Sequence, residues 1–336
     1  MNSFKVALVA LDGQVVPEWV FSEFEAKGVK FVAHECIGTE ELSRWAGDAD
    51  IVWVFGYNQC LHGQMLPEEL SIISRCGAII RTGSGTDNVP VKAATQLGIV
   101  VANTPDAISD AVSDHAIGLL FAVIRQIPVQ DSHVRNKRWD RQNGFPRWHL
   151  RGQTLGLLGF GRIAQAVAKK LVGFEMAILT TDPFASPEAL GRLSVQAVSL
   201  DELMERSDFV SVHCPLNAET RHLVGAAQLN RMKPQSILIN TSRGPVIDEE
   251  ALISALRSKR IAGAGLDVLE SEPPDWKNPL FGLENVVITP HIAGYSDEHL
   301  ENSWRLSVET ALNLFNGRWP RSCVNPEVKP RWNLVR

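Results

Sequence analysis

The sequence lacks the features that mark several classes of protein. No run approaches the roughly 18 apolar residues of a membrane helix, and Asp12 interrupts the apolar start Phe4–Leu11, which predicts a first β-strand rather than a secretion signal. A net charge of −5 provides no basic surface for nucleic acid. The five cysteines have no Cys-x-x-Cys spacing, and no His, Cys or Asp cluster has metal-ligand spacing. We therefore expect a cytoplasmic protein with reduced thiols and without metal, membrane or nucleic-acid partners.

The composition of the sequence is typical of a globular protein, and its apolar and helical segments follow one another in a regular order. Hydrophobic residues make up 45% and charged residues 21% of the 336 residues, and this length suggests two domains. Short apolar runs alternate with helical patterns, which predicts parallel sheets wrapped by helices. Strands are predicted at 4–10, 29–34, 50–55, 77–81, 99–102, 154–158, 176–181, 208–212, 236–240, 262–266 and 285–288, and helices at 17–27, 39–46, 67–74, 90–97, 105–125 and 296–316.

The most informative stretch is Gly156–Ala164, Gly-Leu-Leu-Gly-Phe-Gly-Arg-Ile-Ala, which joins a predicted strand to a predicted helix over 161–171. Gly159 allows a tight turn, Gly161 lets the backbone approach a pyrophosphate, and the small Ala164 lets the helix pack on the strand. The start of the helix offers free N–H groups to phosphates. The pattern predicts a dinucleotide site.

An acid at the end of the next strand supports this interpretation. Asp182 follows the apolar run 176–181 at about the 20-residue spacing where NAD-binding folds place the carboxylate that binds the adenosine ribose. A carboxylate at this position would repel the extra phosphate of NADP. The sequence therefore predicts NAD as the cofactor.

The late position of this motif indicates how the domains are arranged in the sequence. Either residues 1–103 form an independent upstream domain, or the cofactor domain is inserted into another domain; we favour insertion, with chain crossings near Thr104 and Tyr295. The predicted fold is α/β, with two Rossmann-like or flavodoxin-like parallel-sheet domains. Residues 104–294 would bind NAD, and residues 1–103 with 295–336 would form a discontinuous substrate domain.

Three titratable residues follow predicted strands of the second half, at the sheet edge where the nicotinamide should lie. They are Arg243, Glu272 and His291. Histidine exchanges protons near neutral pH, a neighbouring carboxylate fixes its tautomer, and arginine binds a carboxylate through two parallel N–H bonds. Together they suit the reduction of a ketone next to a carboxylate, with a hydride from the cofactor.

At this point the chain resembles the NAD-dependent D-2-hydroxyacid dehydrogenases, over about residues 45 to 325. The matching motifs are Gly156–Ala164, Val212–Leu216, Met232–Pro234 with Asn240–Asp248, and Thr289–His291. The resemblance implies reversible, NADH-dependent reduction of a 2-oxo acid to a D-2-hydroxy acid. Arg243 would hold the substrate carboxylate, and His291, paired with Glu272, would be the acid and base.

The resemblance also implies the remaining contacts. The substrate loop after a first-domain strand would contribute Arg81, Gly83, Ser84 and Gly85, together with Arg243 and His291. The cofactor would be contacted by Ser84, Gly159, Phe160, Gly161, Arg162, Ile163, Asp182, His213, Cys214, Pro215, Thr220, Thr241, Ser242, Asp267, His291 and Gly294.

Some details are most similar to one branch of the family, that of the C-terminal binding proteins, which are corepressors with this fold. These are Arg81-x-Gly-Ser-Gly, Glu270-Ser-Glu272-Pro and Ala293-Gly-Tyr295-Ser, although Gly294 stands where that branch tends to have tryptophan. An NAD(H)-responsive binding module with little turnover is therefore an alternative. Formate or phosphite oxidation is another, but formate enzymes have glutamine where this chain has Glu272.

Several single residues have a second interpretation. Glu270 could partner His291 in place of Glu272, Arg81 could form a structural ion pair, and His115 is most simply a helix-face residue. His213 and Cys214 are expected to form a cofactor wall rather than an acid and a nucleophile.

Two further expectations concern the partner chain and the substrate. The helix at 105–125 and the arm Trp139–Trp148 suggest a homodimer through the cofactor domain. The substrate side chain would be selected by residues around Tyr57–Gln59, Ser84, Trp139 and Tyr295, so glyoxylate, hydroxypyruvate, phenylpyruvate and phosphorylated acids all stay open.

Overall fold

The computed structural model describes residues 3–11, 13–36, 38–55, 65–139, 141 and 149–335. The chain divides into two compact units. Unit 1 consists of Met1–Ile108 and Ser296–Arg336, and unit 2 of Ser109–Tyr295. Along the chain, unit 2 is therefore inserted between the two parts of unit 1. Its boundaries lie near Thr104 and Tyr295, the positions of the expected chain crossings.

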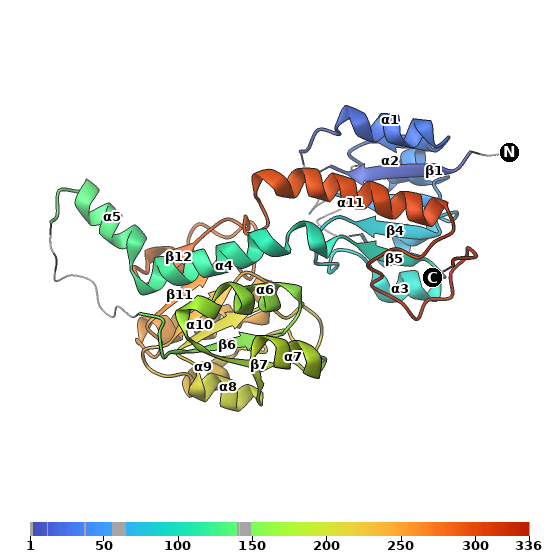
Figure 1. Ribbon diagram of the computed structural model, residues 1–336. Coiled ribbons are helices and arrows are strands. Elements are labelled where there is room, and N and C mark those ends of the chain that lie inside the picture. The colour runs from blue at the N-terminus through green and yellow to red at the C-terminus, as the bar shows by residue number, and fades with distance from the viewer. Residues whose placement is uncertain are drawn as a thin grey trace. The chain divides into compact units, whose positions relative to one another are not determined.

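Unit 1 is built on a five-stranded parallel sheet with the order β2-β1-β3-β4-β5 (Figure 1). This is the strand order of flavodoxin-like folds. Nearly every residue of its inner strands is apolar and buried, as expected for strands that are covered on both faces. The strands are β1 (Lys5–Ala10), β2 (Lys30–Ala33), β3 (Ile51–Val54), β4 (Ala78–Arg81) and β5 (Val100–Asn103).

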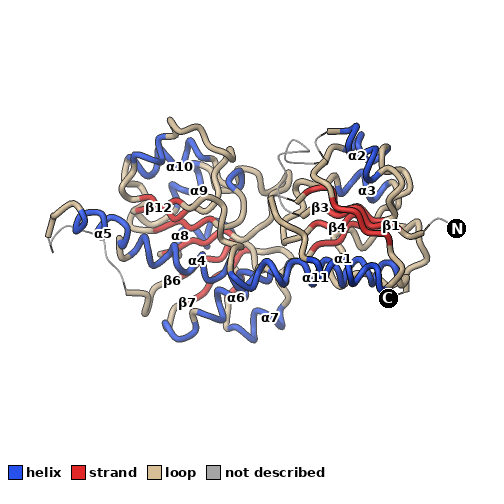
Figure 2. Tube along the Cα trace, turned by 90° about the horizontal axis from the view of Figure 1, so that it is seen from above, coloured by secondary structure: helices blue, strands red, loops and turns tan. Residues whose placement is uncertain are grey.

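Helices cover both faces of this sheet, and one of them comes from the far end of the chain. Figure 2 shows α1 (Glu18–Ala26) and α11 (Asp297–Phe315) on one face, and α2 (Thr39–Ala46) and α3 (Val91–Gln96) on the other. In α11, Trp304 is 1% exposed, and its ring lies 5.4 Å from the ring of Trp53 and 4.1 Å from that of Phe55. The C-terminal helix is thus part of the core of unit 1.

The segment after α11 also belongs to unit 1. The Asn325 amide accepts a hydrogen bond from the Val101 N–H and donates to the Ile99 carbonyl, at 2.8 and 3.0 Å. Arg331 donates to the carbonyls of Leu97 and Cys76. Side chains near the C-terminus therefore bind backbone groups around β5.

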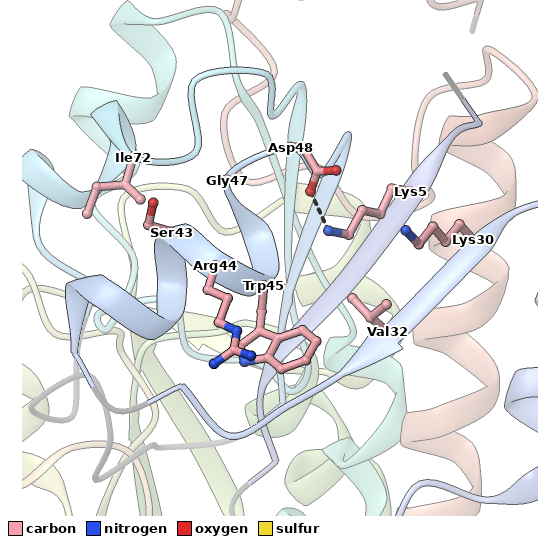
Figure 3. Close-up of a pocket in the computed structure, with 9 residues that line it drawn as sticks. All are labelled: Lys5, Lys30, Val32, Ser43, Arg44, Trp45, Gly47, Asp48 and Ile72. Atoms are coloured by element: carbon pink, nitrogen blue, oxygen red, sulfur yellow. Dashed lines mark hydrogen bonds and ion pairs between the residues drawn. The ribbon is translucent and has the colours of Figure 1, made fainter. Parts of the chain in front are cut away.

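Unit 1 has a pocket of about 550 Å³ where β1 and β2 begin (Figure 3). It is lined by Lys5 and Lys30, the first residues of these strands, and by Arg44 and Trp45 of α2. The Lys5 ammonium donates to the Asp48 carboxylate, so the buried charge has a partner. Parallel α/β sheets bind ligands at the carboxyl ends of their strands, and this pocket lies at the opposite edge from the predicted substrate loop after β4.

Unit 2 contains a seven-stranded parallel sheet with the order β12-β11-β10-β9-β6-β7-β8 (Figure 1). Counted from β6, the order is that of a Rossmann fold with one additional strand. The strands are β6 (Thr154–Leu158), β7 (Ala177–Thr181), β8 (Gln196–Ala197), β9 (Phe209–Val212), β10 (Ile237–Asn240), β11 (Gly263–Leu266) and β12 (Val286–Ile288).

Two apolar cores, one on each face, hold the helices of unit 2 against its sheet. The first core contains apolar residues of α4 (Ser109–Ile124) and α6 (Arg162–Lys170). The second contains those of α8 (Leu200–Arg206), α9 (Ala226–Arg231) and α10 (Glu249–Arg257). A shorter helix, α7 (Pro187–Leu193), follows β7.

Two predicted helices differ in the structure. The helix expected over 105–125 is a 3-10 turn, Pro105–Ala107, followed by α4, because Ile108 has φ −124° and ψ −7°, which is not an α-helical pair. The helix expected over 67–74 is a 3-10 helix, Pro67–Ser71. After α4, Gln126 has φ 53°, and this left-handed residue separates α4 from α5 (Ile127–Arg135).

Helix α5 projects from the body of unit 2 (Figure 1), and none of its residues is buried. Among the described residues, no single helix is long and apolar enough to cross a membrane. Only α4 and α5 taken together, bent by 58°, have the length and composition of such a segment. Burial in the core of unit 2 already explains the apolar character of α4.

Candidate functional site

The residues predicted to carry the chemistry of unit 2 follow neighbouring strands of one parallel sheet. Because the strands run in one direction, their carboxyl ends share one edge, where α/β proteins bind ligands. In this way Gly159 follows β6, Asp182 follows β7, His213 follows β9, Arg243 follows β10, Asp267 and Glu272 follow β11, and His291 follows β12.

The glycine-rich turn has the shape that a dinucleotide requires. Gly159 has φ +92°, and a Cβ atom there would lie 2.8 Å from the Cys214 backbone nitrogen, so a side chain does not fit. No atom lies within 4 Å of a Cβ built on Gly161, which precedes α6. Arg162 and Ile163 form the first turn of α6, and the N-cap residue is Gly161, which has no side chain to bind the N–H groups of this turn. The N-terminal end of α6 can therefore bind a pyrophosphate.

The third small residue of the motif also fits. Ala164 is fully buried, at 0% exposed, in the core between α6 and the sheet. Its methyl group is accommodated, although this position is more commonly a glycine. An alanine at this position therefore leaves the packing of α6 intact.

Asp182 is hydrogen-bonded to the glycine-rich turn. Its carboxylate accepts the Phe160 N–H at 2.7 Å and the Phe184 N–H at 2.8 Å. An ionised carboxylate has about four acceptor positions, so acceptor capacity is left for the hydroxyl groups of a ribose. The acid thus orders the turn and can also bind a ligand.

His213 and Cys214 are unsuited to acid or nucleophilic chemistry. Desolvation lowers the pKa of His213 to about 4, and its Nε2 lies 2.8 Å from the Ser211 hydroxyl. Burial raises the pKa of Cys214 to about 11, so its sulfur is a thiol at neutral pH. Both residues are therefore uncharged near pH 7, and their role as a cofactor wall stays a prediction.

The other residues predicted to contact the cofactor on this side lie in loops. The Thr220 hydroxyl donates to the Pro215 carbonyl at 2.6 Å and accepts the Asn217 N–H, so the loop after β9 is closed by its own bonds. Thr241, directly after β10, is buried, and its hydroxyl has no hydrogen-bond partner among the described residues. A buried hydroxyl without a partner is uncommon in proteins, and a bound ligand would provide one.

Arg243 is held by the backbone of its own turn. The Asn240 side chain accepts the Ser242 N–H and hydroxyl and donates to the Arg243 carbonyl, at 2.9 to 3.0 Å. One guanidinium nitrogen donates to the Ser242 carbonyl at 2.6 Å. A Cβ atom on the next residue, Gly244, would lie 1.8 Å from the Leu269 carbonyl oxygen. The arginine turn therefore packs directly on the segment after β11.

His291 and Glu272 form a close pair. His291 Nδ1 lies 2.6 Å from Glu272 Oε2, and the two side chains are 33% and 37% exposed. The other Glu272 oxygen accepts the Leu269 N–H at 3.0 Å. A carboxylate on Nδ1 favours the tautomer with its proton there and leaves Nε2 to exchange protons with a ligand.

Asp267 supports the loop that carries His291. Its carboxylate, 1% exposed, accepts the Thr289 hydroxyl at 2.6 Å and the N–H groups of Ile292 and Ala293 at 2.9 and 2.8 Å. The His291 N–H donates to the Asp267 carbonyl at 2.7 Å. Sequence reasoning predicted Asp267 as a cofactor contact and did not identify this bracing.

His115 was also missed as a neighbour of this loop. It is a residue of α4, and its Nε2 lies 2.9 Å from the Thr289 hydroxyl. No short motif contains this pair, because 174 residues separate its members. Gly294 lies half-buried at the end of the same loop.

In unit 1, the predicted substrate loop follows β4 and is held internally. Arg81 is 5% exposed, and its Nε donates to the Asn88 side chain at 3.3 Å. Gly83 has φ +107°, and its N–H donates to the Thr104 hydroxyl at 2.8 Å. The Ser84 carbonyl accepts the Asn103 amide, and Ser84 and Gly85 are half-buried.

Several predicted specificity residues lie outside the described residues. They are Tyr57, Asn58 and Gln59, and Trp148 of the arm predicted to form a dimer also lies outside them. Trp139 is described and is 78% exposed, and Tyr295 is 55% exposed.

Comparisons with known proteins agree with this geometry. Residues 117–293 match the protein family described as "D-isomer specific 2-hydroxyacid dehydrogenase, NAD binding domain". The chain is 43% identical to a glyoxylate reductase of Thermococcus litoralis over 252 residues, which are 73% of this chain and 75% of that protein. It is 41% identical to a D-3-phosphoglycerate dehydrogenase of Archaeoglobus fulgidus over 251 residues, 74% of this chain but only 47% of that protein.

A solved structure is similar over almost the whole chain. An acyclic imino acid reductase in complex with NADPH and D-Arg superposes with a TM-score of 0.85 at 31% identity, covering 96% of this chain and 100% of that one. These proteins are named as reductases and a dehydrogenase, so they do not support the expected resemblance to the corepressor branch.

Proposed function

Because the chain belongs to the D-isomer specific 2-hydroxyacid dehydrogenase family, we propose that it catalyses the reversible reduction of a small 2-oxo acid to the D-2-hydroxy acid. The observation that carries the proposal is the pair of His291 and Glu272, which shares one sheet edge with Arg243. Glyoxylate is the first substrate to test, since it is the substrate named for the Thermococcus litoralis relative.

The roles of the three residues follow from their chemistry. When bound, the reduced nicotinamide supplies the hydride for the substrate carbonyl carbon. Arg243 binds the substrate carboxylate, because its guanidinium can donate two parallel N–H bonds to it. His291 donates the proton on Nε2 to the carbonyl oxygen, and in the reverse direction Nε2 accepts the hydroxyl proton. Glu272 stabilises the charged imidazole at Nδ1.

The substrate contacts proposed for unit 1 are Ser84 and Gly85, with Arg81 and Gly83 beside them. The contacts of the loop support different roles for these residues. The Arg81 side chain and the Gly83 N–H bind neighbours within unit 1, which supports a structural role. Ser84 and Gly85 are the more favourable candidates for backbone donors to a carboxylate.

We also propose that NADH is preferred over NADPH. The support is Asp182, whose carboxylate follows β7 and is bonded to the glycine-rich turn at Phe160. A second negative group at the adenosine ribose would be repelled by this carboxylate. The acyclic imino acid reductase, which has a similar fold, is in complex with NADPH, so the proposed preference for NADH rests on Asp182 and not on the fold.

The test is a turnover screen with the purified chain. NADH oxidation is measured with glyoxylate, hydroxypyruvate, phenylpyruvate and a phosphorylated 2-oxo acid, with NADPH in parallel, and the chirality of the product is determined. We expect turnover with at least one acid, a D product and higher kcat/KM with NADH. Tight NADH binding without reduction of any oxo acid would instead favour the NAD(H)-responsive binding module.

We further propose that two copies of the chain associate through α5. The support is that none of the α5 residues is buried, while Ile127, Val134 and Trp139 are 55%, 51% and 78% exposed. Light scattering should show a particle of twice the 37.0 kDa chain. A 37.0 kDa particle at micromolar concentration would contradict the proposal.

A further inference from the structure

The turn Glu270-Ser271-Glu272 holds two glutamates, and each is bonded to a histidine. Glu272 binds His291, as described above, and Glu270 Oε1 lies 2.7 Å from His222 Nε2. Both histidines have φ 53°, in the left-handed region that non-glycine residues rarely adopt. Such backbone persists only where its surroundings hold it. The two glutamate–histidine pairs therefore both hold the same turn in place.

Glu270 also fixes the turn to a helix. Its second carboxylate oxygen accepts the Glu249 N–H at 3.1 Å, and its own N–H donates to the Glu249 carboxylate at 3.0 Å. Glu249 is the first residue of α10 and also accepts the Asn278 amide at 2.7 Å. The turn that carries Glu272 is thus bound to α10 by a reciprocal pair of hydrogen bonds.

His222 completes this cluster from the other side. Its N–H donates to the Pro245 carbonyl at 2.8 Å, which places it against the turn that follows Arg243. The reciprocal bonds bring the Glu249 and Glu270 carboxylates near each other, and like charges repel. A histidine that bonds Glu270 reduces this repulsion, most strongly when its ring is protonated. His222 therefore stabilises the position of Glu270.

We propose that His222 and Glu270 are positioning residues that hold the turn so that Glu272 meets Nδ1 of His291. The inference deepens the proposed function and rests on it. Both side chains are partly exposed, at 42% and 32%, so their ion pair adds little to overall stability. Their effect is on geometry, because small displacements of a catalytic group reduce rates strongly.

The test uses Glu270→Gln and His222→Gln, with Glu202→Gln as the matched control. Glu202 pairs with Arg206 on the surface of α8, a helix that precedes β9. We expect Glu270→Gln and His222→Gln to lower kcat about tenfold. KM for the oxo acid and Kd for NADH should change less than twofold, and Glu202→Gln should behave as wild type.

Two further measurements separate positioning from a general structural effect. In a Glu272→Gln background, Glu270→Gln should cause no further loss of kcat, because its effect passes through Glu272. Nitrogen-15 spectra of histidine-labelled protein, with His291 assigned by His291→Gln, should show the Nδ1-protonated tautomer in wild type. The same spectra should show a mixture of tautomers in Glu270→Gln.

The proposal is overturned if Glu270→Gln leaves both kcat and the His291 tautomer unchanged. It is equally overturned if the loss of kcat is as large in the Glu272→Gln background as in wild type. If wild type reduces no oxo acid, the proposed function fails, but the spectra still decide whether Glu270 orders His291. The two failures are therefore distinguishable.

Discussion

The two sheets use their carboxyl-terminal edges differently. In unit 2, polar groups after one strand bind the segment after a neighbouring strand of the sheet: Asp182 binds Phe160, and Asp267 binds Ile292. In unit 1, the loop after β4 binds mostly within itself and to β5, and the Arg81 guanidinium is buried there. A charged side chain at a strand end is thus no guide to function by itself. Its partners decide whether it serves a ligand or the loop.

The largest expected effect comes from substitutions in unit 2 at the residues proposed to carry the chemistry. Arg243→Ala and His291→Ala should each lower kcat/KM by about a thousandfold or more, because they remove the carboxylate clamp or the proton donor. NADH binding, measured by fluorescence titration, should change less than twofold. Activity of either variant near the wild-type value would contradict the proposed roles.

For Arg81 in unit 1, the comparison predicts a loss of stability rather than a loss of a ligand contact. Arg81→Met removes a buried donor to Asn88, and urea unfolding should show a loss of about 1–3 kcal/mol. NADH affinity should remain that of wild type, because the glycine-rich turn is untouched. A variant with normal stability and a strongly raised KM would instead make Arg81 a substrate contact.

A smaller effect is expected at the cofactor acid. Asp182→Ser removes the charge that opposes a ribose phosphate, and the ratio of kcat/KM for NADPH to that for NADH should rise about tenfold. Affinity for NADH should also fall, since Phe160 loses its acceptor. Glu188→Ser, a change at an exposed acid in the first turn of α7, is the control and should leave the ratio unchanged.

The smallest effect is expected at His213, in the pH dependence of the free energy of unfolding. Desolvation lowers the pKa of His213 to about 4, whereas an unfolded chain has a histidine pKa of about 6.5. Between these values the unfolded state binds the additional proton, so the free energy of unfolding falls as the pH is lowered. When the pH is lowered from 7 to 5, the free energy of unfolding of His213→Gln should fall by about 1 kcal/mol less than that of wild type. Equal losses, measured by urea unfolding at both values, would contradict this assignment.

Much of the fold followed from local patterns in the sequence. Strand positions and the turn at Gly156–Ala164 depend on neighbouring residues, so the sequence predicted them well. The break before α4 was missed because it depends on the backbone angles of Ile108, which no apolar pattern records. The 3-10 helix at Pro67–Ser71 was missed for a similar reason, since its apolar spacing resembles that of an α-helix.

The site followed from sequence only where a motif names the residue. Arg243, Glu272 and His291 lie in recognisable strand-end motifs, and the structure brings Glu272 to His291. The family resemblance favoured Glu272 over Glu270 as the partner of His291, and the structure pairs Glu272 with His291 and Glu270 with His222. His222 is 48 residues from its partner Glu270, so no spacing rule connects them.

Gly244 has a consequence for how this protein can vary. Any other residue there would push a carbon into the Leu269 carbonyl and force the arginine turn away from the segment that leads to Glu272. A single base change in this codon is therefore expected to displace Arg243, the residue proposed to hold the substrate carboxylate, without altering any residue proposed to contact the substrate or the cofactor.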